Sequence, residues 1–334
     1  MKKFFAVLLS ASFLFCFASC DSEKTDTDAL YEITLCLDWT PNTNHTGFFA
    51  ADALGYYEQE GIKLSIVQPP EDGAELMTAS GQSQFGISFQ DSLAGIFTNQ
   101  QSMNITAVAA VLQHNTSGVI SRKGEGIHTP KGLENKNYST WNSAVELAMI
   151  EELMLSDGAD PEKLQLVPSV TNEAQALKNR DIDAVWVYYG WAGISCEIQD
   201  VETDYFALSD INPVFDYYTP VIIANDEFLK NEPEKAAAFI RATKKGYEYA
   251  AQNPQQAAQH LIDGDTTGSL KGMEELVVES QKWISEKYID DAESWGIIDQ
   301  QRWDTFYAWL YEKGLIEAEI KEGTGFTNNL LRSN

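Results

Sequence analysis

Two short segments of the chain carry side chains suited to holding a flat, nitrogen-rich ligand. The first places Asp38, Trp39, Asn42 and His45 close together. The face of the Trp39 indole can stack on a heterocycle, an interaction that contributes about 1–3 kcal/mol for stacked nucleic acid bases. The carboxylate, amide and imidazole beside it can exchange hydrogen bonds with ring and exocyclic nitrogens. Each of these side chains could instead serve only as a cap, a turn residue or a core residue.

The second segment is an aromatic cluster made of Trp186, Tyr188, Tyr189 and Trp191. These rings exceed what one buried strand face needs, so we expect Tyr188 or Tyr189 to oppose Trp39 across a cleft. Trp186 fits a core position better, and Trp191 suits the core and the site equally. No lysine or arginine stands in the candidate segments, although an anion receptor normally needs such a cation or a helix N-terminus. The pattern therefore favours a neutral aromatic ligand over a small anion.

Other polar and aromatic side chains stand where strands are expected to end. They are Gln90, Asn115, Thr116, Ser117 and Trp141. Gln90 could bond the edge of a ligand or lie in solvent at the start of a helix. The segment from Asn115 to Ser117 offers hydroxyls and backbone N–H groups, but it could equally be a hinge turn. Because ligands of α/β proteins gather at the carboxyl ends of strands, we expect these groups to meet at one cleft.

The elements that must position these side chains form two blocks of alternating strands and helices. The expected strands are Tyr31–Leu37, Ile62–Val67, Phe85–Ser88 and Ile105–Leu112 in the first block, and a short strand at Tyr138, Leu164–Val167 and Ala184–Tyr188 in the second. Helical patterns separate the strands, which indicates an α/β fold with mostly parallel sheets. The chain from Glu227 onward is nearly all helical, with Pro233 and Pro254 at first-turn positions.

The two blocks predict two lobes joined by two hinge crossings. We expect lobe 1 to comprise residues 30–118 plus 222–334, with lobe 2 at 119–221. A return strand at Val221–Ala224 would bring the chain back into lobe 1. A ligand held between such lobes favours the closed arrangement.

The N-terminus predicts export. Residues 1–19 have a basic start and an apolar stretch too short to span a bilayer comfortably, as in a signal peptide. Small residues before Cys20 resemble a lipoprotein cleavage box, which makes Cys20 the expected lipidation site and residues 20–29 a flexible tether. An uncleaved N-terminal anchor is the alternative. With Cys16 removed in the signal peptide and Cys20 lipidated, only Cys36 and Cys196 remain in the domain. They are most simply unpaired buried thiols, although a disulfide between them stays open.

The charge of the chain excludes some classes of partner. With 23 basic and 50 acidic residues the net charge is −27, which argues against nucleic acid and anionic lipid surfaces. The four histidines are scattered, and no Cys/His spacing resembles a metal site.

Several of these motifs resemble those of the thiamine-pyrimidine family. The matching segments are Trp39–His45 (WTPNTNH), Gly55–Ile62 (GYYEQEGI), Gly81–Ile87 (GQSQFGI), Asp181–Ala184 (DIDA) and Asn225–Leu229 (NDEFL). That family joins periplasmic receptors for thiamine pyrimidine precursors to a fungal pyrimidine-precursor synthase on the same fold. The resemblance implies a two-lobed periplasmic-binding-protein fold of type II. The first segment is fairly specific, whereas the second and fourth also occur in nitrate, sulfonate and taurine receptors.

Differences from the family pattern bear on the function. The synthase has a pyridoxal phosphate lysine where this chain has Ser88, and a cysteine-rich run where residues 215–220 contain no cysteine. An enzyme is therefore not expected. Family receptors often carry an acid just after the aromatic pair, but Ala192 and Gly193 stand there, and the next acid is Glu197. This difference leaves room for a larger flat ligand such as a flavin.

The sequence thus predicts a lipid-anchored, exported and monomeric receptor that binds a small planar heterocycle without a cofactor. It would deliver the ligand to the permease of an ABC importer. A thiamine pyrimidine precursor is the leading ligand, followed by riboflavin-like compounds and then by nitrate, sulfonate or taurine.

Overall fold

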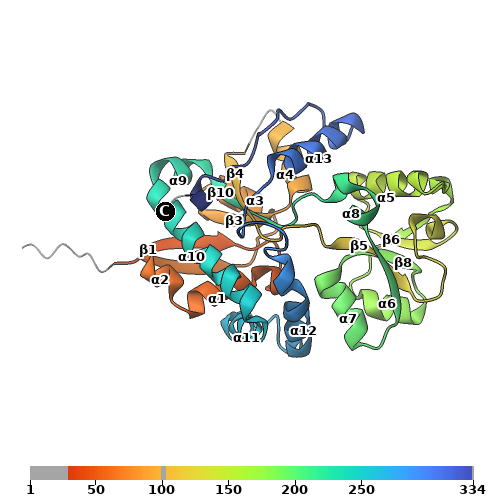
Figure 1. Cartoon of the computed structure of the whole chain (residues 1–334), viewed down its shortest axis with the longest axis horizontal. Helices are drawn as coiled ribbons and strands as arrows, with labels where there is room; N and C mark the ends of the chain where they lie inside the picture. Colours follow the sequence, from red (N-terminus) through yellow and green to blue (C-terminus); the bar gives the residue numbers. More distant parts are fainter. Residues whose placement is uncertain (1–28, 99–102, 333–334) are drawn as a thin grey trace, which may run out of the picture.

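The computed structural model describes residues 29–98 and 103–332. No helix in these two ranges is both long enough and apolar enough to cross a membrane. The signal peptide and the lipidated Cys20 predicted from the sequence lie outside the described residues. The rest of the chain forms two lobes side by side, each built around one sheet (Figure 1).

The first sheet has the strand order β2-β1-β3-β10-β4. Its strands are β1 (Tyr31–Cys36), β2 (Ile62–Val67), β3 (Phe85–Ser88), β4 (Ile105–Ala110) and β10 (Val221–Asn225). β1 runs parallel to β2 and β3, whereas β10 is antiparallel to both β3 and β4. The sheet is therefore mixed, and β10 alone among its strands runs in the reverse direction.

The second sheet repeats this plan with the strand order β7-β6-β8-β5-β9. Its strands are β5 (Ser117–Arg122), β6 (Asn137–Thr140), β7 (Gln165–Pro168), β8 (Ala184–Tyr188) and β9 (Thr203–Ala207). β5 is antiparallel to β8 and β9, while β6 is parallel to β7 and β8. β9 was not expected from the sequence.

The reversed strand of each sheet is the one that the chain enters after crossing between the lobes. The first crossing joins β4 to β5, and the second joins β9 to β10 through α8. The other strands bring their carboxyl ends to the crossings, so an entering strand must start where they end. Ser117 and Val221 thus begin β5 and β10 at the edge where the candidate site residues gather. The exact division of residues between the lobes stays a prediction.

Helices cover the sheets on both faces (Figure 1). In the first lobe they are α1 (Thr46–Ala53), α2 (Tyr56–Gln59), α3 (Gly73–Ala79), α4 (Gln90–Thr98), α9 (Asp226–Asn231), α10 (Pro233–Gln252), α11 (Pro254–Gly264), α12 (Glu274–Ile284) and α13 (Gln300–Glu312). In the second lobe they are α5 (Ala144–Ser156), α6 (Glu173–Asn179), α7 (Ile194–Ile198) and α8 (Leu208–Ile211). Two short helices matter for the site, η1 (Thr43–His45) and the π-helix η4 (Tyr189–Gly193). Pro233 and Pro254 lie in the first turns of their helices, as expected.

The tail helices complete the core of the first lobe. Phe239 of α10 stacks on Phe85 of β3 with ring centroids 3.9 Å apart. A Cβ on Gly47 of α1 would lie 2.3 Å from the Tyr247 ring, so only glycine lets α1 approach α10 this closely. This packing holds α1, and therefore the turn that precedes it, against the sheet.

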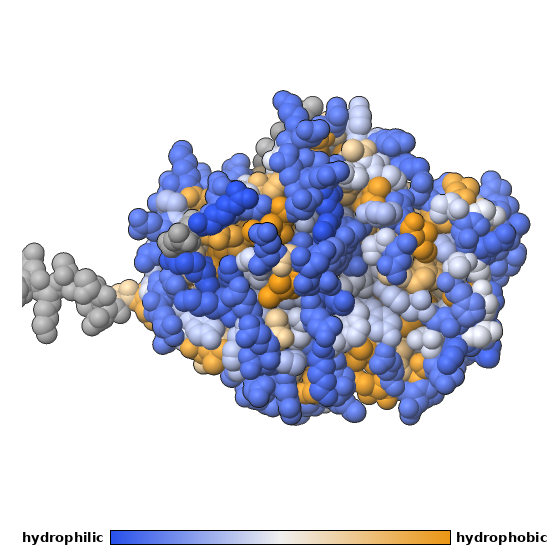
Figure 2. All heavy atoms as spheres, viewed as in Figure 1, coloured by the Kyte–Doolittle hydropathy of each residue, from blue (hydrophilic) through white to orange (hydrophobic). Residues whose placement is uncertain are grey.

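One apolar cluster continues from the first lobe into the second. It joins Leu93 of α4 and Trp303 of α13, through Tyr217 and Tyr218 of the second crossing, to Trp186 of β8. The outer surface in Figure 2 is mostly hydrophilic, and apolar residues appear there as separate areas. The hinge region is thus part of the interior rather than an exposed linker.

Candidate ligand-binding site

The turn that follows β1 is held by its own polar side chains. The side chain of Asn42 caps η1 by accepting a backbone N–H two residues on at 2.9 Å. The backbone N–H of Asn42 donates to His45 Nδ1 at 3.2 Å, so Nε2 carries the ring proton and donates to Asp38 Oδ1 at 2.6 Å. Asn42 and His45 are both buried. These three predicted contact residues therefore fix the turn that presents Trp39.

Two large aromatic side chains stand in solvent at this edge of the molecule, one from each sheet. Trp39 follows β1 and is 56% exposed, and Trp141 follows β6 and is 48% exposed. The Trp141 ring lies 5.7 Å from that of Trp186, which is buried in the core as the sequence predicted. Single exposed apolar residues are common on protein surfaces. Two tryptophans at strand ends of facing sheets suit a planar ligand better.

Tyr188 links the two sheets electrostatically. Its hydroxyl lies 3.2 Å from Thr219 Oγ1 of the second crossing. Burial raises the pKa of Tyr188, and the negative charges of Asp91 and Asp38 raise it further. Thr219 stands two residues before Val221, which is the register partner of Ser88 at the end of β3. The end of β8 therefore lies close to the end of β3.

Tyr189 and Trp191 both contact the first lobe. The Tyr189 ring packs 4.6 Å from Tyr205 and 5.4 Å from Trp283, and its hydroxyl donates to Glu197 at 2.6 Å. Trp191 packs against an apolar cluster of lobe 1 helices. Which of the two tyrosines opposes Trp39 stays a prediction.

The π-helix η4 also makes polar contact across the lobes. Ser280 of α12 donates to the carbonyl of Gly190, and its hydroxyl lies 2.6 Å from that of Thr43 in η1. A Cβ on Gly190 would come within 3.0 Å of the Trp283 ring. α12 therefore connects the turn before α1 with the aromatic segment of lobe 2.

Gln90 is buried and fully engaged, and the solvated alternative is wrong. Its Nε2 donates to the Trp303 carbonyl at 2.9 Å, and its Oε1 accepts from the backbone N–H of Tyr218 at 2.8 Å. The structure thus shows Gln90 fastening α4 to the second crossing and to α13. Its role as a ligand contact stays a prediction.

The segment from Asn115 to Ser117 forms a hydrogen-bonded turn in the first crossing, and its roles as a hinge and as a ligand contact stay predictions. Asn115 donates to the Phe215 carbonyl at 2.8 Å and accepts from the Ser117 N–H at 2.9 Å. The Thr116 carbonyl accepts from the N–H of Tyr189 at 3.1 Å. These bonds fasten the first crossing to the second and to the end of β8.

A candidate site residue that the sequence did not point to lies beside Gln90. Asp91 is in the first turn of α4, and its Oδ1 is buried without a hydrogen-bond partner among the described residues. Burial is the main cause that raises the pKa of Asp91 to about 6, and the charge of Glu75 adds to it. Glu75 itself accepts from Ser88 Oγ at 2.6 Å. The position of Asp91, directly after a residue already suspected at a strand end, was the available signal.

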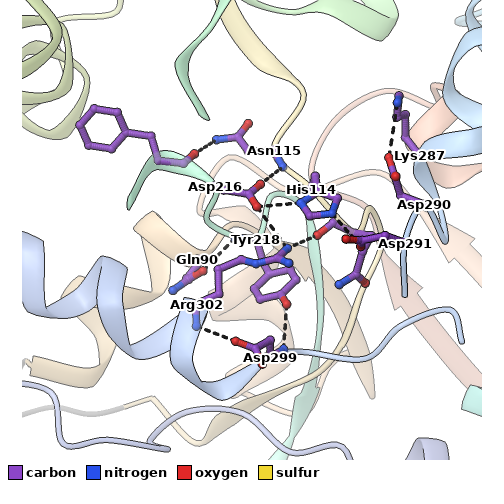
Figure 3. Close-up of polar contacts among 12 residues, drawn as sticks. Gln90, His114, Asn115, Asp216, Tyr218, Lys287, Asp290, Asp291, Asp299 and Arg302 are labelled. Carbon is purple, nitrogen blue, oxygen red and sulfur yellow. Dashed lines mark hydrogen bonds and ion pairs between the residues drawn. The ribbon is translucent and has the colours of Figure 1, made fainter. Parts of the chain in front are cut away.

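A charged network joins both crossings to the C-terminal tail (Figure 3). His114 lies between two carboxylates, with Nδ1 2.7 Å from Asp216 and Nε2 2.9 Å from Asp291. Arg302 lies 3.5 Å from Asp216 and stacks 5.0 Å over the Tyr218 ring. The hydrogen bond to Asp216 is the largest cause of a raised pKa of His114. The network fixes the two crossings relative to each other.

Within residues 29–98 and 103–332, one group has the geometry to hold a metal ion, made of His114, Asp290 and Asp291. Both ring nitrogens of His114 are already paired with carboxylates, so the group has a sufficient role in the hinge network. Cys36 and Cys196 are buried free thiols. Cys36 ends β1 of the first sheet, and Cys196 lies in α7 of the second lobe.

Comparison with known sequences finds one family, which includes a binding protein and synthases. A family model described as "NMT1/THI5 like" matches residues 42–257. The chain is 27% identical to the formylaminopyrimidine-binding protein of Halalkalibacterium halodurans over 336 residues, covering 98% of this chain and 99% of that protein. It is 29% identical to a 4-amino-5-hydroxymethyl-2-methylpyrimidine phosphate synthase of Saccharomyces cerevisiae over 251 residues, covering 70% of this chain and 71% of the synthase.

Comparison with solved structures identifies the fold. The zinc-bound ligand-binding component of an ABC-type import system from Staphylococcus aureus superimposes with a TM-score of 0.66. The two chains are 18% identical, and the match covers 91% of this chain and 98% of the other. The expected two-lobed α/β binding-protein fold is therefore confirmed.

Proposed function

Because the chain belongs to the NMT1/THI5-like family, we propose that it is a solute-binding protein that captures a pyrimidine precursor of thiamine. The observation that carries this proposal is the pair of exposed tryptophans, Trp39 and Trp141, with Tyr188 at the convergent strand ends. The full-length similarity to a formylaminopyrimidine-binding protein supports the same ligand class.

The binding mode follows from the chemistry of these side chains. The exposed Trp39 indole stacks on one face of the heterocycle, and the aromatic side chains of lobe 2 cover the other when the lobes close. Asp38 uses Oδ1 for His45 in the described structure, so Oδ2 is the oxygen that we assign to a ligand N–H. Asn42 and His45 position Asp38 and Trp39 through their hydrogen bonds within the turn, and their own contact with the ligand stays a prediction.

We further propose that the protein is a receptor and not an enzyme, although synthases are among its relatives. Ser88 stands where the family resemblance places the pyridoxal phosphate lysine, and it is buried and bonded to Glu75. A hydroxyl at this place has no amine for a Schiff base.

The remaining proposals concern where the protein works. Residues 1–19 would direct export, Cys20 would carry a lipid, and the monomeric receptor would deliver its ligand to an ABC importer permease. The negative net charge of −27 supports a partner that is neither nucleic acid nor an anionic membrane surface.

Titration calorimetry on the purified full chain tests the proposed ligand. The panel contains formylaminopyrimidine, 4-amino-5-hydroxymethyl-2-methylpyrimidine, riboflavin, taurine and nitrate, and we expect Kd values at or below about 1 μM for the aminopyrimidines, about −8 kcal/mol of binding free energy. Tight binding of taurine or nitrate, together with no binding of the pyrimidines, contradicts the proposal. Tight binding of riboflavin alone would show that the ligand is a flavin and not a pyrimidine. An absorbance band from bound pyridoxal phosphate would contradict the receptor assignment.

A further inference from the structure

Two buried polar atoms near Tyr188 have no hydrogen-bond partner in the part of the chain that the structure describes. They are Asp91 Oδ1 and Ser117 Oγ. Ser117 is completely buried. Buried polar atoms in folded proteins are almost always bonded, so an unpaired acceptor and an unpaired hydroxyl in one region require an explanation. A bound molecule that supplies the missing partners is such an explanation.

The two groups approach Tyr188 from different sheets. Ser117 begins β5 and is the register partner of Tyr188, so both side chains lie on the same face of the second sheet. Asp91 is the second residue of α4, directly after Gln90, whose side chain accepts from Tyr218. The residue after Tyr218 is Thr219, whose hydroxyl lies 3.2 Å from the Tyr188 hydroxyl. The unpaired groups therefore border the region where the strand ends converge.

Their chemistry specifies the edge of a ligand. A carboxylate oxygen only accepts hydrogen bonds, whereas a serine hydroxyl can donate one. A 4-aminopyrimidine presents an amino donor directly beside a ring nitrogen acceptor. We propose that Asp91 accepts from the exocyclic amino group of the ligand and that Ser117 donates to the neighbouring ring nitrogen. This inference rests on the proposed function and specifies how the same site selects its ligand.

The surroundings of Asp91 favour a ligand that donates to it. The groups that act electrostatically with Asp91 are Glu75 from α3, Tyr188 from β8, Tyr217 from the second crossing and Tyr307 from α13, and none of them is a cation. Burial raises the pKa of Asp91 to about 6 even though the backbone N–H groups of Asp91 and Ser92 lower it, and Oδ1 still lacks a donor among the described residues. An amino group of the ligand would supply that donor.

The inference also accounts for a difference from the family pattern. The resemblance leads one to expect an acid just after Tyr188 and Tyr189, but the next acid, Glu197, is bonded to the Tyr189 hydroxyl. In this chain the acid for the amino group would come from the first lobe, at the start of α4.

The test compares two probes that differ only at this edge. They are 4-amino-5-hydroxymethyl-2-methylpyrimidine and its 4-oxo counterpart, in which donor and acceptor are exchanged. Calorimetry is carried out on the full chain and on the variants Asp91→Asn and Ser117→Ala. Asp52→Asn is the matched control, because Asp52 is an exposed lobe 1 acid on α1 and is not among the site residues. Thermal unfolding without ligand verifies that each variant folds.

We expect the unaltered chain to prefer the amino probe by about 100-fold or more, as sites with dedicated polar partners do. Asp91→Asn should weaken the amino probe by about tenfold or more and strengthen the oxo probe, because its amide can donate to the new carbonyl. Ser117→Ala should weaken the amino probe, and Asp52→Asn should change neither affinity.

Equal weakening of both probes by Asp91→Asn, or no change in either, overturns the inference and leaves the proposed function standing. If Asp91→Asn does not fold, unchanged affinity of Ser117→Ala for the amino probe overturns it instead. An unaltered chain that binds neither probe overturns the proposed function and this inference together.

Discussion

Trp39 keeps more than half of its surface in water, while the polar side chains around it are buried. This arrangement reverses the usual preference of both residue types. Burying Asn42 and His45 costs little because each is hydrogen-bonded within the turn. Exposing the indole has no such compensation in the free protein, so the residue is best explained by what it binds.

Replacing Trp39 by alanine should weaken ligand binding by about 1–3 kcal/mol, because a stacked aromatic face is lost. The free energy of unfolding should change little, since the side chain is 56% exposed. Calorimetry and denaturant titration measure the two quantities. Tyr311→Ala removes an aromatic side chain that is 46% exposed on α13 and serves as the control. Equal affinities of the Trp39 variant and the unaltered chain would remove Trp39 from the site.

At the scale of residues, the sequence predicted the turn from Asp38 to His45, but not which of its side chains hold the turn together and which is exposed. Spacing alone identifies side chains that can bind a ligand, whereas the bond from His45 to Asp38 appears only when η1 forms. Gln90 was recognised and its neighbour Asp91 was not, because the groups on which the charge of Asp91 acts, such as Tyr217 and Tyr307, are distant in the sequence.

Among the elements, the connection from β6 to α5 depends on one buried carboxylate. Glu146 accepts from the Tyr138 hydroxyl at 2.9 Å, from Thr140 Oγ1 at 2.8 Å and from the Trp141 N–H at 3.0 Å. Asn142 takes the left-handed conformation in this turn, with φ of 60°. Glu146 therefore sets the direction in which Trp141 leaves the second sheet.

Glu146→Gln should lower the free energy of unfolding by about 1–3 kcal/mol, because the amide cannot accept all three hydrogen bonds and one donor loses its partner. Denaturant titration measures this change. Glu151→Gln alters an exposed acid on the same helix and should leave the free energy unchanged within about 0.5 kcal/mol. A stable Glu146 variant with an unaltered midpoint would show that the turn does not need the carboxylate.

Element boundaries were predictable where local pattern and tertiary role agree. The strands Ile62–Val67, Phe85–Ser88 and Ala184–Tyr188 form with the expected bounds. β9 was missed because only Phe206 among its five residues is buried, which leaves almost no hydrophobic signal. Its strand form comes from pairing with β5, an interaction between residues far apart in sequence.

In the whole molecule, His114 connects the hinge to the tail, which gives stability a defined pH dependence. Its pKa is raised in the folded state, mainly by the hydrogen bond to Asp216, so its contribution is fully present below its ordinary value of 6.5. That contribution is lost as the pH rises through the raised folded value. Asp291 has the opposite sign, because its lowered pKa gives a contribution that is lost when the pH falls through the folded value.

The difference in unfolding free energy between the unaltered chain and His114→Gln should therefore shrink as the pH rises above 6.5. Denaturant titrations in a pH series from below 6.5 to alkaline values measure it. Taking the difference removes the contributions of other titrating groups, such as Asp91. Gln301→Ala changes an exposed, uncharged side chain beside Arg302 and removes no titrating group, so it should give a difference that does not depend on pH. A constant difference for His114→Gln would contradict the network in Figure 3.

At this scale the sequence predicted two lobes and two crossings, and the comparison with solved structures confirmed the fold. It could not predict that α12 reaches across to η4, or that α13 fastens the second crossing through Gln90. Such contacts join residues more than 80 positions apart, and no local pattern encodes them.

The contact between α12 and η4 places two tryptophan side chains where their fluorescence depends on how the lobes are arranged. Trp283 lies against Tyr189 of the opposite lobe, and Trp191 of that lobe packs among helices of the first. Any separation of the lobes must transfer these two indoles from an apolar, ring-lined environment towards water. We therefore expect their share of the tryptophan emission to change when the lobes separate, so that fluorescence can follow ligand capture without an attached dye.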